Sequence, residues 1–257
     1  MIFRRIKAHI AKEDWFAVFI DFIIVVFGVF MGFQVNNWNE ERARAQTEHI
    51  YIDRLRDDLL RNHEDATQRL AYYTQVRDHG IKALAALEQP QATLGEDFLI
   101  DIYQTSQIIP RVFARDTYDE ILSVGANNAI SDVAVRNRLA NFYGSIQAQL
   151  KTLDRTTPYR AEIRRHLPYY AIQAINGACG DIVETGAAGE PTIALPKQCE
   201  PGLSELQISQ AVDIILERNI RPDLTERISD IDGKLWGLDR ILKRVDLLDD
   251  YLETIQK

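Results

Sequence analysis

The sequence is poor in the residues and motifs from which most enzyme sites are built. Its 257 residues include two cysteines, which do not form a Cys-x-x-Cys pair and have no histidine near them in the chain. The glycine-rich phosphate loop, the dinucleotide-binding fingerprint, the Gly-x-Ser-x-Gly elbow and the His-Glu-x-x-His zinc motif are all missing from the sequence. We therefore expect no enzyme activity, no catalytic residues, no metal site and no cofactor.

Basic residues are outnumbered by acidic ones. The 30 Lys and Arg residues face 38 Asp and Glu residues, so the formal net charge is -8 at pH 7. Proteins that bind nucleic acid concentrate Lys and Arg to neutralise phosphates. The charge balance therefore argues against nucleic acid as a partner.

The remaining titratable residues offer no recognisable reaction centre. His49, His63 and His79 fall in one helical stretch, but no carboxylates accompany them at metal-ligand spacing, so we interpret them as ordinary polar positions. The pairs Asp57-Asp58 and Asp249-Asp250 are adjacent only along the chain. Neighbouring residues on a helix point about 100° apart, so neither pair forms a two-carboxylate site by itself.

One long apolar run stands out against this polar background. Trp15 to Val35 spans roughly 30 Å as a helix, which matches the hydrocarbon core of a bilayer. A cleaved signal peptide is the main alternative, but no Ala-x-Ala site follows the run. A buried helix of a soluble protein is the other, although Phe, Ile and Val occupy every face. We predict a retained transmembrane helix, with the lipid bilayer as one partner.

The flanks of this run predict its orientation. Four basic residues precede it, whereas charges balance after it, and Lys and Arg stay on the cytoplasmic side of membranes. We therefore expect residues 1–14 in the cytoplasm, 15–35 in the membrane and 36–257 outside. Residues 2–12 also have the pattern of a short amphipathic helix on the inner leaflet. Trp15 and Trp38 bracket the span as interfacial anchors.

Three positions within the span raise questions of packing. Gly28 and Gly32 form a Gly-x-x-x-Gly pair, a pattern that allows two helices to approach closely but also occurs by chance. A homodimer through this face is one of two open alternatives. An ionised Asp21 deep in the bilayer would cost at least about 2.5 kcal/mol. It is either a carboxylate near the inner headgroups that water reaches or a contact for a partner helix.

The two cysteines bracket an unusual segment. Cys179 and Cys199 flank a stretch rich in glycine and proline, and we expect an irregular loop over residues 176–202. Cross-linking the ends of such a loop stabilises the fold by roughly 3 kcal/mol in the chain-entropy model. We predict a disulfide in an oxidising compartment, with free structural thiols as the alternative.

The rest of the chain is helical in pattern, and we predict an all-α fold. Apolar residues at spacings of three and four run from Glu40 towards Gln89-Pro90, so the membrane helix should continue outward as a long rod. Further helices are expected over 95–109, 115–124, from a cap at Ser131 or Asp132 to about 157, over 159–167 and over 203–219.

The last helix, predicted from Asp223, carries the most regular pattern. Its apolar positions follow steps of four and three, which is typical of coiled-coil-like packing against another long helix. We favour antiparallel packing on the first helix within the chain, and a second copy is the alternative. The stripe comprises Leu224, Ile228, Ile231, Leu235, Leu238, Leu242, Val245, Leu248, Leu252 and Ile255.

One basic group invites a weaker hypothesis. Arg160, Arg164, Arg165 and His166 lie close together in the chain and could contact an anion. Their more ordinary interpretation is a solvated helix face.

Two blocks of the sequence carry a resemblance to a known family. The junction 33–42, Phe-Gln-Val-Asn-Asn-Trp-Asn-Glu-Glu-Arg, and the block 117–125, Thr-Tyr-Asp-Glu-Ile-Leu-Ser-Val-Gly, are similar to a family of uncharacterised bacterial single-pass membrane proteins, a domain of unknown function. The resemblance covers roughly residues 1–145 and implies an envelope protein. Gly125 suggests a tight turn between helices.

Taken together, these patterns predict a protein of the bacterial inner membrane with a periplasmic helical domain that acts as a scaffold or interaction module. Its partner would be another protein or a second copy. The alternative is a sensor or signal-transmitting subunit, which would couple binding in the periplasm to a membrane partner. An enzyme is the third hypothesis.

Overall fold

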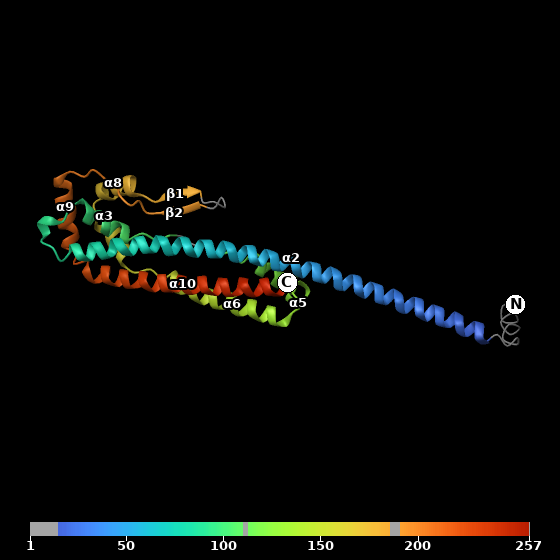
Figure 1. Cartoon of the computed structure of the whole chain (residues 1–257). Coiled ribbons are helices and arrows are strands. Elements are labelled where there is room, and N and C mark those ends of the chain that lie inside the picture. The colour runs from blue at the N-terminus through green and yellow to red at the C-terminus, as the bar shows by residue number, and fades with distance from the viewer. Residues whose placement is uncertain (1–14, 110–112, 186–190, 257) are drawn as a thin grey trace.

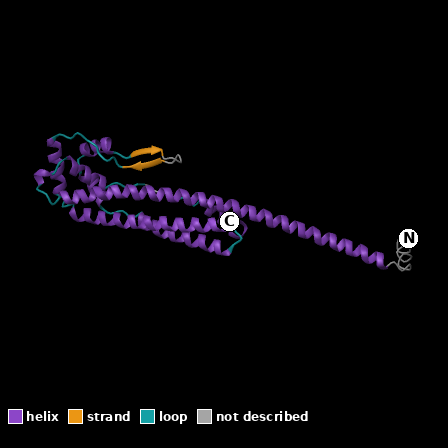
Figure 2. Cartoon of the chain, viewed as in Figure 1, coloured by secondary structure: helices purple, strands orange, loops and turns teal. Residues whose placement is uncertain are grey.

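The computed structural model describes residues 15–109, 113–185 and 191–256. Figures 1 and 2 show an elongated molecule in which one helix runs nearly the whole length. The elements in chain order are α2 (Trp15–Ala86), η1 (Gln91–Thr93), α3 (Glu96–Thr105), α4 (Asp116–Val124), α5 (Ala126–Ala129), α6 (Val133–Leu153), α7 (Tyr159–His166), α8 (Tyr169–Cys179), β1 (Ile182–Thr185), β2 (Pro191–Ala194), α9 (Glu205–Leu216) and α10 (Arg221–Gln256).

Helix α2 is continuous through the predicted membrane boundary, as the sequence pattern indicated. The three asparagines at 36, 37 and 39 lie within it, because Asn is only a modest helix breaker and the flanking residues are good helix formers. The helix ends at Ala86, three residues before the predicted Gln89-Pro90, and the intervening residues form turns.

Helix α10 packs along α2 within the same chain, which confirms the favoured pairing (Figure 1). The buried side chains of α10 include Leu224, Ile231, Leu238, Val245 and Leu252 from the predicted stripe. The helix begins at Arg221 rather than at the predicted Asp223, because proline is tolerated in the first turn, where its missing N–H is not needed. The coiled-coil character of this pair stays a prediction.

Buried side chains form two clusters. The first, which we call the proximal core, joins α2 to α4, α6 and α10 and includes Leu55, Leu59, Ile146 and Val245. The second, the distal core, joins α3, α7, α8 and α9 to the far end of α2. The half of α2 that precedes Glu48 contributes to neither cluster.

Local capping signals place two helices as expected. The Asp132 carboxylate accepts hydrogen bonds from the N–H groups of Ala134 (2.6 Å) and Val135 (3.4 Å), so Asp132 is the N-cap of α6. Helix α6 ends at Leu153, before the predicted boundary at 157. Ser204 and Gln207 form a capping box at the start of α9.

Gly125 separates α4 from the short helix α5, which confirms the predicted turn. Its φ of +90° lies in a region that side chains with a Cβ rarely adopt.

The described residues are mainly helical, as the sequence predicted, but the prediction of an irregular loop over residues 176–202 is wrong, because this segment contains a two-stranded sheet. Helix α8 extends to Cys179, and β1 and β2 form an antiparallel hairpin in which Val183 pairs with Ile193. The β-branched residues Ile182, Val183 and Thr185 favour extended structure. The glycines and prolines around them obscured this signal, and residues 186–190, which include Gly186 and Gly189, lie outside the described residues.

The hairpin is attached to α2 by a pair of reciprocal hydrogen bonds. The Gln75 side chain donates to the carbonyl of Leu195 (3.2 Å) and accepts from its N–H (2.9 Å). The Leu195 side chain is buried in the proximal core. The hairpin therefore lies against the helical rod rather than standing apart from it.

Candidate functional site

The apolar part of α2 is exposed on every face. Its described large apolar side chains, from Phe19 to Val35, are 40 to 65% exposed. Among the described residues, α2 is the one helix long and apolar enough to cross a membrane. This surface is far larger than the scattered exposed apolar residues of soluble domains.

The predicted packing residues of the span are partly described. A Cβ atom added at Gly28 or Gly32 would meet nothing within 4 Å, so this face of the helix is open to a neighbour. Asp21 and Trp15 lie within α2, but their side chains are outside the described residues. Residues 1–14, the predicted cytoplasmic segment and its amphipathic pattern, are also outside them.

Trp38 lies one turn beyond the apolar surface, where an interfacial anchor was expected. Its side chain is 54% exposed, and the Arg42 guanidinium lies over its ring at 4.1 Å from the centroid. From here to Thr47 the helix is exposed on all sides. We call residues 36–47 the stalk.

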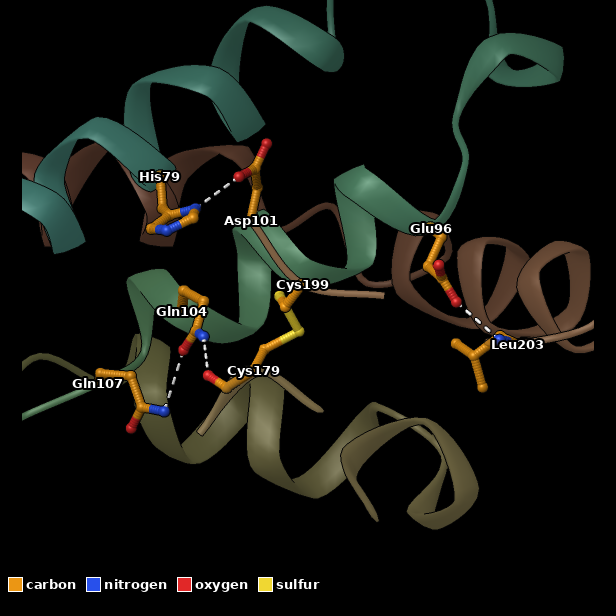
Figure 3. Close-up of a disulfide and its surroundings, with 8 residues drawn as sticks. All are labelled: His79, Glu96, Asp101, Gln104, Gln107, Cys179, Cys199 and Leu203. Carbon is orange, nitrogen blue, oxygen red and sulfur yellow. Dashed lines mark hydrogen bonds and ion pairs between the residues drawn. A yellow bond between two sulfur atoms is a disulfide. The ribbon is translucent and has the colours of Figure 1, made fainter. Parts of the chain in front are cut away.

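The predicted disulfide is present. The Cys179 and Cys199 sulfurs are bonded, and their Cα atoms are 5.3 Å apart (Figure 3). Cys179 ends α8 and Cys199 follows β2, so the bridge closes the base of the hairpin. The Gln104 amide donates to the Cys179 carbonyl (2.5 Å), and the Gln107 amide donates to the Gln104 side chain (3.1 Å). These bonds fix the bridge against α3.

Beside the disulfide, α2 and α3 are joined by a histidine and a carboxylate. His79 Nδ1 and Asp101 Oδ1 are 2.6 Å apart, and both side chains are mostly buried (Figure 3). His63 lies 3.5 Å from Asp246, and His49 is elsewhere along α2. The structure does not bring the three histidines together. In the ranges 15–109, 113–185 and 191–256, no group of three or more His, Cys, Asp or Glu is arranged to hold a metal ion.

The adjacent carboxylates point apart. Asp58 is buried and accepts a hydrogen bond from the Thr117 N–H (3.1 Å), whereas Asp57 faces an open groove between α2 and α10. In that groove, Asp249 pairs with Arg56 at 2.7 Å. The groove has a volume of about 560 Å³ and is lined by Asp53, Arg56, Asp57, Leu59, Leu60, His63, Val245, Asp246 and Asp249.

The predicted basic cluster divides into two parts. Arg160 and Arg164 face α3: the first donates to the carbonyl of Ser106 (2.6 Å), and the second lies over the Tyr103 ring at 3.9 Å. Burial lowers the pKa of Arg164, and the neighbouring Tyr103 opposes this. Arg165 pairs instead with Glu162 at 3.1 Å.

His166 completes the second part of this cluster. Its Nε2 lies 3.1 Å from the same Glu162 carboxylate that Arg165 contacts. The four side chains therefore do not converge on a common point. Arg164 donates from all three of its guanidinium nitrogens within the fold, and Arg160 donates from Nη1.

Sequence reasoning missed two buried cations on α10. Arg227 is 1% exposed and donates to the carbonyls of Thr105 (3.1 Å) and Gln107 (2.7 Å). Lys234 donates to the carbonyl of Leu153 (2.6 Å). Burial lowers the pKa of both groups, and the nearby Asp230 opposes this shift.

The burial of these two cations could have been predicted from their positions in the sequence. Arg227 and Lys234 are seven residues apart and lie on the apolar face of the predicted stripe. A charge at such a position implies a buried partner, because burying an unpaired charge is very costly. Here the partners are backbone carbonyls at the ends of other helices and the Asp230 carboxylate, which lies 3.0 Å from Arg227 and 3.5 Å from Lys234.

Comparison with known proteins supplies no family. No family model, no curated protein and no solved structure matches the chain. The similarity of residues 1–145 to uncharacterised single-pass membrane proteins therefore stays a prediction, and any functional proposal has to rest on the arrangement of the chain's own residues.

Proposed function

We propose that this protein is a membrane-anchored periplasmic scaffold. In this proposal residues 15–35 cross a bacterial inner membrane, residues 1–14 lie in the cytoplasm, and residues 36–257 form a helical interaction domain in the periplasm. The observation that carries it is the division of α2 into an apolar half exposed on every face and a half packed into the bundle. A lipid bilayer is the natural cover for a helix that is apolar all round.

The disulfide supports an external location for the domain. Bridges such as Cys179–Cys199 persist in oxidising compartments and are rare in the bacterial cytoplasm. The basic flank before the span agrees, since Lys and Arg favour the cytoplasmic side.

An exposed face of α10 supports the interaction role. Trp236 and Leu247 are 63% and 67% exposed, and Arg240 stacks over the Trp236 ring at 4.5 Å. With Lys243 they follow steps of four and three along one side of the helix. Tryptophan and arginine are the residues that most often dominate protein interfaces, so we place the partner, whether another protein or a second copy, on this face.

Two fusions test the topology. Alkaline phosphatase joined after Lys257 should be active, because it folds only after export, and a fluorescent protein that folds only in the cytoplasm should stay dark at the same position. Thiol alkylation should label Cys179 and Cys199 only after denaturation and reduction. An inactive phosphatase with a bright fluorescent fusion would refute the proposed orientation.

Crosslinking in cells tests the scaffold role. A photoreactive amino acid at Trp236 should give a discrete crosslinked species, whereas the same group at the exposed Lys151 on α6 should not. Mass spectrometry of that species separates a second copy from a different protein. Equal patterns at both positions would contradict a specific partner face.

A sensor is the second candidate, and the continuity of α2 favours it. An unbroken helix from the distal core into the apolar span could transmit a rotation or shift produced by binding. If this is the function, a break in the stalk should abolish the response of a membrane partner without weakening periplasmic binding. If the protein is a scaffold only, the same break should change neither the periplasmic binding nor the behaviour of the membrane partner.

A further inference from the structure

The stalk has two faces with different chemistry. On one face the Asn36 amide donates to Glu40 (2.8 Å), and Arg44 lies 3.9 Å from the same carboxylate. On the opposite face Arg42 folds back over Trp38, four residues earlier, at 4.1 Å from the ring centroid. Cation–π contact of this kind fixes the position of a guanidinium without using its N–H groups.

Arg42 has no acidic partner among residues 15–109, 113–185 and 191–256. The residues one turn away from it are Trp38, Asn39, Ala45 and Gln46, and none carries a charge. In the part of the chain that the structure describes, the Arg42 guanidinium contacts the Trp38 ring and no other side chain. Its five N–H donors therefore remain available to a ligand from outside the chain.

The depth of this pair along α2 indicates which ligand is near. Trp38 stands three residues beyond Val35, the last apolar residue, or about 4.5 Å at 1.5 Å per residue. The headgroup layer on each side of a bilayer is about 5 to 8 Å thick. Because Arg42 folds towards the N-terminus and onto Trp38, the proposed span places its guanidinium in that layer. Arg44 lies two residues further from the apolar span along α2, and its guanidinium pairs with Glu40 instead.

We infer that Trp38 and Arg42 form a binding site for the phosphodiester of a phospholipid headgroup on the outer side of the membrane. The guanidinium fork matches two phosphate oxygens, and arginine is suited to this contact because it is planar and always charged. The site would fix the depth and rotation of α2 where it leaves the bilayer. This inference rests on the proposed membrane anchoring and adds to it one specific contact between the chain and a lipid phosphate.

The test uses the full chain with Trp15→Phe and Trp236→Phe, so that Trp38 is the only fluorophore of its kind. The protein is placed in vesicles of phosphatidylcholine brominated high on its chains, and in vesicles of a phosphate-free glycosyl diacylglycerol brominated in the same way. Quenching by bromine reports insertion of Trp38, and quenching by acrylamide reports exposure to water. Arg42→Gln removes the proposed contact, Arg42→Lys keeps a charge, and Arg44→Gln is the matched control.

In phospholipid, Arg42→Gln should lower the ratio of inserted to water-exposed Trp38 about five-fold, which corresponds to about 1 kcal/mol, the upper end for a solvent-exposed ion pair. Arg44→Gln should leave the ratio unchanged, and Arg42→Lys should fall between them. In the phosphate-free vesicles the protein that retains Arg42 should behave like the Arg42→Gln variant. Arg42→Gln itself should not distinguish the two lipids.

Three outcomes separate the possible failures. Equal ratios with and without the Arg42→Gln substitution in both lipids, with strong bromine quenching throughout, would overturn the phosphate site and leave the anchor intact. If bromine quenched Trp38 in neither of the two lipids, the membrane anchoring itself would be overturned. Recovery of the ratio in phosphate-free vesicles on adding inorganic phosphate would show a free-anion site and would overturn the assignment to a lipid headgroup.

Discussion

Helix α2 has one backbone geometry but two kinds of surroundings. Before Asn36 the described apolar side chains, from Phe19 to Val35, point in all directions and none is buried, whereas between Ile52 and Val76 they form a buried stripe opposite polar residues. The first half has the composition of a helix that needs a uniformly apolar solvent, and the second has that of a helix with one packed face. The comparison teaches that the bundle covers the second half, whereas under the proposed function a bilayer would cover the first.

The largest expected effect on the free energy of unfolding comes from a substitution in the packed half. Leu55 is 0% exposed in the proximal core, so Leu55→Ala should lower the free energy of unfolding by about 2–5 kcal/mol through lost burial and a cavity. Phe27→Ala, in the exposed half, should leave that free energy unchanged. Denaturant unfolding of the full chain in detergent, followed by circular dichroism, measures both. Equal losses would mean that the two halves share one folding unit.

Alkaline pH should act on the packed half alone. Burial is the main cause that raises the pKa values of Tyr72, Tyr143 and Tyr159, whereas no tyrosine occurs from Trp15 to Ile50. Above about pH 10 the unfolded chain loses tyrosyl protons that the folded chain retains, so stability is complete below that pH and falls above it. The loss should approach about 1.4 kcal/mol for each tyrosine and pH unit.

The measurement for this prediction is tyrosinate absorbance recorded together with helical circular dichroism. The two signals should change in one cooperative step, while sedimentation with vesicles stays constant. Lys234, whose pKa burial lowers, acts in the opposite direction between its folded and unfolded pKa values, but it is one group against three. Tyrosine ionisation well below the loss of helix would contradict the prediction.

Substitution of one glycine in each half of α2 tests the same difference. A Cβ at Gly80 would lie 2.9 Å from Ile228 Cγ1 and 3.1 Å from Thr105 Cγ2, because α3 and α10 approach α2 closely there. Gly80→Leu should therefore destabilise the domain by about 1–3 kcal/mol. A Cβ at Gly32 has no described atom within 4 Å, so Gly32→Leu should not change the free energy of unfolding. Any effect of Gly32→Leu should appear only as reduced self-association in membranes, measured by cysteine crosslinking in the span.

The sequence predicted the features that depend on long periodic patterns or local caps. The continuous α2, the apolar stripe of α10 and the Asp132 cap all follow from residues within a few turns of one another. The disulfide was also predictable, because only one pairing of two cysteines is possible.

Features that depend on distant contacts were not predictable in this way. Arg227 is buried because it donates to the carbonyls of Thr105 and Gln107, more than a hundred residues earlier. Arg160 and Arg164 seemed to be a solvated face or an anion site, yet their donors go to the end of α3. The hairpin was missed because its four-residue strands are too short for alternation to outweigh the surrounding glycine and proline.

The smallest expected effect on stability, and the most informative on mechanism, concerns the boundary between the two halves. Asn37→Pro removes an intrahelical hydrogen bond and introduces a clash with the preceding turn, a local cost of about 3 kcal/mol or more. The stalk touches neither core, so the free energy of unfolding of the domain should change by less than about 0.5 kcal/mol.

Spin labels on cysteines introduced at Met31 and Ala43 report the break, since both native cysteines are bridged. The unsubstituted stalk should give a narrow distance distribution near about 18 Å, from 1.5 Å per residue, and Asn37→Ala should preserve it, whereas Asn37→Pro should broaden it. A broad distribution without the proline would mean that the two halves of α2 are joined by a hinge, which would remove the mechanical basis for a sensor while leaving an anchored scaffold intact.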